Sequence, residues 1–170
     1  GDHRDLHSFP TRRSSDLMTN DNALQMTPQD HRQAFTEVAF LIESFANTID
    51  NIMGGATAPV GRIAGRAMAR KLPLNLEQPS LESVLAMLAE RMQAGFQIAV
   101  APDGETAAEL TFQRCALREV CSLRSMEPGT AVCRLFHAYF DGIVNELLHR
   151  PVKSEIQVAG PLCRIRTCSQ

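Results

Sequence analysis

The first helical segment of the chain carries a continuous apolar face. Its apolar side chains recur at spacings of three and four residues, as one side of an α-helix requires. They are Phe35, Val38, Ile42, Phe45, Ile49 and Ile52. Thr27 and Pro28 form a helix start, and the Gly54-Gly55 pair ends the helix. We expect this face to lie in the core, either alone or with part of it in a dimer contact.

Two shorter helices are predicted next, at residues 59–71 and 80–95. On the first of them small residues recur every fourth position, which lets another element approach closely. These are Gly61, Gly65 and Ala69, and a parallel arginine stripe consists of Arg62, Arg66 and Arg70. The stripe is interpreted as a solvated face, with an anion site as the alternative.

The second half of the chain alternates between strand and helix patterns. Residues 96–100 and 108–112 alternate apolar with polar or small side chains around Asp103-Gly104, which predicts a hairpin. Residues 115–127 read as an irregular connector with a short helix near Cys121.

Residues 130–148 are apolar nearly all round, which predicts a helix covered on more than one side. Residues 152–158 and 162–168 then form two further strands. The predicted order is ααα-ββ-α-ββ, an α+β domain with helices packed on a small antiparallel sheet.

Composition narrows the classes of partner. The net charge is −2, tryptophan is absent and Tyr139 is the only tyrosine, so we expect no nucleic-acid partner. After residue 17 no apolar run reaches the length of a membrane span. Five cysteines without a secretion signal indicate reduced thiols, and we therefore expect a cytoplasmic protein.

Thiols and one imidazole in the last third of the chain are the candidate metal ligands. Cys133 and His137 are four residues apart on one helix face, and Cys115 and Cys121 lie just upstream. Thiolate and imidazole are ligands that suit zinc. A second set consists of Cys133, Glu155 and Cys163.

A cysteine–histidine pair also suggests nucleophilic catalysis, and Asp141 lies one turn beyond His137. The helix is apolar and no oxyanion donors are recognisable in the sequence. We therefore assign no catalytic residues and expect a binding domain rather than an enzyme.

The first residues stand apart from the rest of the chain. Residues 7–17 read HSFPTRRSSDL, which resembles the translation of a common sequencing adapter. Residues 1–17 are therefore treated as an artefactual or disordered segment, and Met18 as the natural start. Residues 18–170 are expected to form a single domain.

Residues 53–168 resemble the 4-vinyl reductase, or small-hydrocarbon-binding, domain family. The resemblance rests on GGATAPVGRIAGRAMARKLP at residues 54–73, CRLFHAYFDGIVNELLHRPV at residues 133–152, and the terminal CRIRT. It implies the fold shared by TRAPP transport-particle subunits and haem nitric-oxide sensors, a homodimer, and a ligand in an apolar cavity.

The resemblance also implies a zinc site at Cys133, Glu155 and Cys163. A further family cysteine is replaced here by Val158, so Cys168, Cys121 or His137 would have to substitute for it.

The leading hypothesis is a sensor-type domain that holds a small hydrophobic or aromatic molecule. Aromatic residues of the 130–148 helix and the sheet are the expected lining, since such pockets are mostly apolar. They are Phe112, Phe136, Tyr139 and Phe140. The alternatives are a metal or redox sensor based on Cys115, Cys121, Cys133 and His137, and an accessory factor in tetrapyrrole pigment biosynthesis.

Overall fold

The computed structural model describes residues 26–72 and 79–170, so the predicted N-terminal segment 1–17 lies outside the described residues. The elements, in chain order, are α1 (Pro28–Ile52), α2 (Ala58–Ala69), α3 (Leu81–Arg91), β1 (Phe96–Pro102), β2 (Ala107–Cys115), α4 (Ala116–Leu123), α5 (Ala131–Leu148), β3 (Val152–Val158) and β4 (Cys163–Ser169). This confirms the predicted α+β class and element order, with one addition. The short helix expected near Cys121 is α4, and it takes up most of the connector that was predicted to be irregular.

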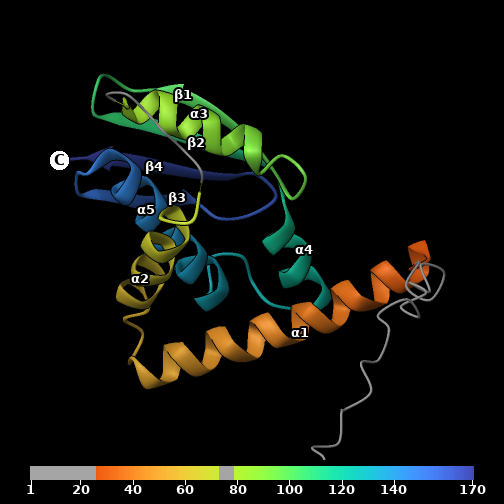
Figure 1. The fold of residues 1–170 in the computed structure, drawn as a ribbon. Coiled ribbons are helices and arrows are strands. Elements are labelled where there is room, and N and C mark those ends of the chain that lie inside the picture. The colour runs from red at the N-terminus through yellow and green to blue at the C-terminus, as the bar shows by residue number, and fades with distance from the viewer. Residues whose placement is uncertain (1–25, 73–78) are drawn as a thin grey trace, which may run out of the picture.

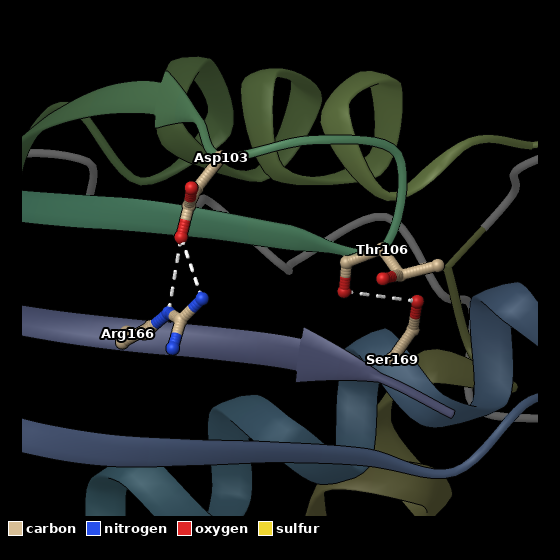
Figure 2. A network of polar contacts seen from close by, with 4 residues as sticks. All are labelled: Asp103, Thr106, Arg166 and Ser169. Atoms are coloured by element: carbon tan, nitrogen blue, oxygen red, sulfur yellow. Dashed lines mark hydrogen bonds and ion pairs between the residues drawn. The ribbon is translucent and has the colours of Figure 1, made fainter.

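The strands form one antiparallel sheet in the order β1-β2-β4-β3. The C-terminal strand therefore lies in the middle of the sheet, between two strands that precede it in the chain. Figure 2 shows how β4 is fastened to the β1–β2 hairpin. Both Nε and Nη2 of Arg166 donate to Asp103 Oδ2, at 3.1 and 2.7 Å, and the Ser169 hydroxyl donates to the Thr106 carbonyl at 3.3 Å. The Ser169 N–H donates to the same carbonyl at 2.8 Å.

One hydrophobic core lies between the sheet and the helices α2, α3 and α5. Its largest fully buried side chains come from all of these layers except α2 and include Phe112, Phe140, Leu85, Leu110 and Ile165. A smaller cluster of Ala46, Ala131 and Val132 joins α1 to α5. The first cluster explains why α5 is apolar nearly all round, because the sheet covers one side and α2 another.

Helix α2 packs against α5 through glycines, as the small-residue stripe predicted. A Cβ atom at Gly61 would lie 2.6 Å from the Leu135 carbonyl oxygen, and one at Gly65 would collide with the carbonyl of Tyr139. On the other side of the contact, a Cβ at Gly142 would lie 2.8 Å from the Cα of Arg62. The two backbones can touch only because these three positions lack side chains.

Helix α1 is a long arm that runs along one side of the molecule, with α4 between it and the sheet (Figure 1). Its start is as predicted: the Thr27 hydroxyl accepts from the Asp30 N–H and the Asp30 carboxylate accepts from the Thr27 N–H. Ion pairs from Arg134 to Asp50, at 2.8 Å, and from Arg124 to Glu43 hold it to α5 and α4.

The expectation that the α1 seam forms core in this chain is wrong for most of its length. Phe45 is 61% exposed and Ile52 is 77% exposed, whereas the fully buried α1 residues are Ala39 and Ala46. The helix meets α4 and α5 through small side chains on its flank, and Ile42 and Ile49 face the same side, whereas Phe45 and Ile52 point to solvent. Periodicity identifies an apolar face, but it does not say what covers that face.

In residues 26–72 and 79–170, no helix combines the length and the hydrophobicity that crossing a membrane demands.

We predict that Gly65→Ala strongly destabilises the fold, since the added methyl group meets the α5 backbone, which cannot move aside as a flexible side chain would. Overpacking of this kind costs about 3 kcal/mol of unfolding free energy. Chemical denaturation followed by circular dichroism measures it. Gly160→Ala is the control, because a Cβ there has nothing within 4 Å. Equal stability of the two variants would contradict the close α2–α5 contact.

Candidate functional site

Helix α5 carries side chains into three neighbouring hollows of the molecule. One is an apolar groove toward α1 and α2, one is a small cysteine-lined pocket toward the sheet, and one is a polar cleft toward α2 and β3. Residues spaced three or four apart on α5 share a face, which explains how one helix serves all three.

The apolar groove has a volume of about 490 Å³ and no charged residue in its lining. It is lined by Ile42, Ala46 and Ile49 of α1, Val60, Gly61 and Ala64 of α2, Leu117 of α4, and Val132, Leu135, Phe136 and Tyr139 of α5. Gly61 and Ala64 leave space where larger side chains would close the groove. A hollow of this size and polarity can hold a small apolar molecule.

The four aromatic residues predicted as ligand lining are divided by the structure. Phe136 and Tyr139 do line the groove, and burial raises the pKa of the Tyr139 hydroxyl, so it stays uncharged. Phe112 and Phe140 are only 1% and 2% exposed and belong to the core. Phe136 links the two regions, because its ring stacks on Phe96 with centroids 4.8 Å apart.

The cysteine-lined pocket lies where α4, α5, β2 and β4 meet. Cys115, Cys133, Cys163 and His137 line it, and the thiol of Cys121 lies against that of Cys133. Its volume of about 20 Å³ suits a water molecule or an ion rather than an organic ligand. Burial raises the pKa values of Cys115, Cys121 and Cys163, so these side chains are thiols near neutral pH and weak nucleophiles.

Two other predicted ligands lie away from this pocket. Glu155 is exposed on β3 and faces Arg166 across the β3–β4 ladder, whereas Cys163 lies on the inward side of β4 with Ile165. Cys168 is one residue out of phase with Cys163, Ile165 and Thr167, and it points to the outer face with Arg166. The structure thus gathers Cys133 and Cys163 with Cys115, Cys121 and His137, and not with Glu155.

The thiols and His137 have the donor chemistry for zinc. Within the part of the chain that the structure describes, no three His, Cys, Asp or Glu side chains are arranged to hold one metal ion. A zinc site therefore stays a prediction, and its strongest ligands by position are the four inward cysteines and His137.

His137 forms the wall between the cysteine-lined pocket and the polar cleft. Its ring meets Phe112 and Phe136 edge to face, with centroids 5.7 and 5.5 Å apart. Burial lowers the pKa of His137 to about 4, so the imidazole is neutral near pH 7. A neutral imidazole can accept a proton or a hydrogen bond from a bound molecule.

The polar cleft has a volume of about 300 Å³, and its buried acid is Asp141. Asp141 Oδ2 accepts the Ser154 N–H at 3.0 Å, while Oδ1 is buried and has no hydrogen-bond partner. Asp141 therefore bonds to β3 instead of orienting His137. Burial raises the pKa of this carboxyl, although the Ser154 hydrogen bonds and the charges of Arg62 and Lys153 oppose the shift.

The sequence analysis did not assign Asp141 a binding role. The signal was present: Asp141 is the one acid between Ala131 and Ile143 in an otherwise mostly apolar helix, and it follows Cys133 by eight residues and His137 by four. That spacing places all three on neighbouring parts of one helix face. What the sequence could not show is that Ser154 and Arg62 converge on the same carboxyl.

We predict that His137 makes the fold less stable as the pH falls from about 6.5 toward 4, because only the unfolded state then takes up its proton. The loss amounts to roughly 3 kcal/mol over this interval, at about 1.4 kcal/mol per pKa unit. His137→Phe keeps an aromatic ring and removes the titration, so its thermal stability should fall less. The exposed His149→Asn is the control and should follow the wild type. Identical pH profiles for wild type and His137→Phe would contradict the buried, neutral imidazole.

Comparison with solved structures identifies the fold. The chain resembles a trafficking protein particle complex subunit 3 from Naegleria fowleri covalently bound to palmitic acid, with a TM-score of 0.59 and 10% identity over 82% of this chain and 96% of that one. It also resembles the phenol-responsive sensory domain of the transcription activator PoxR, solved with phenol, with a TM-score of 0.52 and 12% identity over 79% and 74% of the two chains. These likenesses confirm the transport-particle type of fold that the sequence resemblance implied.

No match to this chain is found among curated proteins. The family model described as L-2-amino-thiazoline-4-carboxylic acid hydrolase matches residues 13–166, which is most of the sequence. The resemblance to the 4-vinyl reductase family thus led to the right fold, and the name of that family is not confirmed. The chain belongs to the L-2-amino-thiazoline-4-carboxylic acid hydrolase family.

Proposed function

We propose that this protein binds a small, mostly apolar organic molecule in the groove between α1, α2, α4 and α5. The observation that carries the proposal is the lining of the groove, which has a volume of about 490 Å³ and is formed without any charged side chain. Burial of apolar surface drives the binding of such a molecule, by roughly 25 cal/mol for each Å² removed from water.

Two proteins of this fold are solved with molecules of that chemical kind. One is the transport-particle subunit bound to palmitic acid and the other is the sensory domain bound to phenol. Their likeness to this chain concerns the fold, and it supports a cavity-forming architecture rather than a particular ligand. Because α1 forms one wall of the groove, a molecule bound there would change how α1 packs. We therefore propose a sensor-type role for this protein.

Filling the groove tests the proposal. Ala64→Phe should weaken binding of the neutral fluorescent probe N-phenyl-1-naphthylamine by about tenfold, because the new ring occupies the volume that the probe needs. Ala67→Phe is the matched control, since Ala67 is an exposed alanine on the same helix and does not line the groove. Probe binding that is unchanged in Ala64→Phe would exclude the groove as the binding site.

We also propose that a second copy of the chain covers the exposed apolar face of α1 in a cytoplasmic homodimer. Large apolar side chains follow this helix from Phe35 to Ile52, and patches of that extent mark interaction surfaces. The same helix forms one wall of the groove, so dimer formation would close the groove from outside.

Charge placed on this face should separate the copies. We expect Phe45→Glu to sediment as a monomer and the wild type as a dimer, because the carboxylate cannot be buried without a partner. Ile63→Glu, at an equally exposed apolar position on α2, should remain dimeric. A wild type that sediments as a monomer at all concentrations would refute the dimer.

Hydrolysis of a small heterocyclic acid is the second candidate function. The observation in its favour is the match of nearly the whole chain to a family described by that activity, together with a polar cleft that holds a buried acid and a neutral imidazole. Such a pair can move protons during hydrolysis. Consumption of L-2-amino-thiazoline-4-carboxylic acid by the purified protein is the assay for this candidate. The thiol-based sensor and the pigment-biosynthesis factor stay predictions.

A further inference from the structure

The polar cleft contains a hydrogen-bond acceptor that receives no hydrogen bond from residues 26–72 and 79–170. Asp141 is 3% exposed, and its Oδ1 atom is buried without a partner in the cleft formed by α2, α5 and β3. A buried polar atom without a hydrogen bond costs about 1–3 kcal/mol, so nearly all such atoms in folded proteins have partners. Oδ1 of Asp141 therefore keeps its capacity to accept a hydrogen bond, and a donor that enters the cleft could satisfy it.

Besides Asp141, the charged residues that line the cleft are the cations Arg62, Arg134 and Lys153 and one further carboxylate, Glu155. Arg62 on α2 is half-buried and Lys153 lies on β3, and both act on the Asp141 carboxyl. Arg134, also in the lining, is already paired with Asp50 at 2.8 Å. Arg62 is the cation of the cleft best placed to bind an anionic group, because its charge is partly shielded from water.

The glycine contact between the helices puts Arg62 beside Asp141. The backbone of Arg62 lies on Gly142, where any side chain would collide with it, and Gly142 directly follows Asp141. The three arginines of the sequence stripe thereby acquire different surroundings. Arg62 lines the cleft, Arg66 is exposed, and Arg70 pairs with Glu146 at 2.7 Å.

We propose that this cleft is a binding site for a small carboxylic acid that also carries an N–H donor group. Asp141 Oδ1 accepts the N–H, Arg62 binds the carboxylate, and the neutral His137 forms the side wall between them and the cysteine-lined pocket. The site is separate from the apolar groove. This proposal extends the second candidate function, hydrolysis, and it depends on that function only for the choice of the test ligand.

Calorimetric titration with L-2-amino-thiazoline-4-carboxylic acid tests the assignment, since this molecule has both required groups. Asp141→Asn and Arg62→Ala should each weaken binding about tenfold or more, as expected for loss of a hydrogen bond to a charged group. Arg66→Ala, one turn away on the same helix and outside the cleft, should bind within about twofold of the wild type. Removal of the carboxylate from the probe, in 2-amino-thiazoline, should abolish the difference between wild type and Arg62→Ala.

Folding is checked in the same variants. The Asn side chain can still accept the Ser154 N–H, and it replaces a carboxyl whose ionisation is disfavoured by burial. The melting temperature of Asp141→Asn at pH 7 should therefore be no lower than that of the wild type. A stable Asp141→Asn that binds the acid as tightly as the wild type would overturn the proposal. So would a wild type that does not bind the acid, or an Arg66→Ala variant as weak as Arg62→Ala.

The outcomes separate this site from both proposed functions. Ala64→Phe should block the apolar probe and leave titration of the acid unchanged, because Ala64 lines the groove and not the cleft. Loss of acid binding in Ala64→Phe would place the acid in the groove and overturn the cleft. Tight binding of the acid without its consumption would reject hydrolysis and uphold the site.

Discussion

The direct contact between the backbones of α2 and α5 is the constraint on which the rest of the molecule depends. Gly61, Gly65 and Gly142 leave no side chain between the two helices, so their separation is set by main-chain atoms. A contact of this kind is rigid, since peptide groups cannot adopt another rotamer to make room. The helix pair therefore provides a fixed frame against which the sheet packs on one side and α1 on the other.

The fixed spacing of α2 and α5 places the apolar groove and the polar cleft next to each other. The apolar groove opens beside Gly61 and Ala64, where the small-residue side of α2 faces α1. The polar cleft opens next to Gly142, where α2 brings Arg62 to β3. Between them α5 turns Phe136 and Tyr139 toward the groove and His137 and Asp141 toward the cleft.

Helix α1 is attached to the other elements less firmly than α2 and α5 are attached to each other. It is joined to the body by small side chains, by Ile42 and Ile49 beside the groove and by two ion pairs, while most of its large apolar groups are exposed. Ion pairs at the surface contribute little, typically about 0–1 kcal/mol each. An element held this weakly by its own chain can respond to a molecule in the groove or to a second copy on its outer face. The uninterrupted apolar seam of α1 thus lies mostly outside the core of this chain.

The sequence by itself determined the elements of this protein and their class. Alternation and helical periodicity located the helices and the strands, because both patterns are local consequences of backbone geometry. It also marked the α2 stripe, where glycines at every fourth position could only mean close packing. The resemblance to ligand-binding domains added the transport-particle type of fold, and of the four aromatic residues predicted as lining, Phe136 and Tyr139 do line the groove.

Only the tertiary structure decided which side chains share a site. The sheet order places β4 between β2 and β3, and this brings Cys163 inward to Cys115 and Cys133 while it leaves Glu155 on the outer face. Phe112 and Phe140, chosen as lining by residue type, are core because Phe112 of β2 and Phe140 of α5 both pack into the cluster between the sheet and the helices. The polar cleft joins Arg62, Asp141 and Ser154 across up to 92 residues of sequence, and no local pattern records such a meeting. Local patterns report the conformation of neighbouring residues, whereas a site depends on distances between segments that only packing sets.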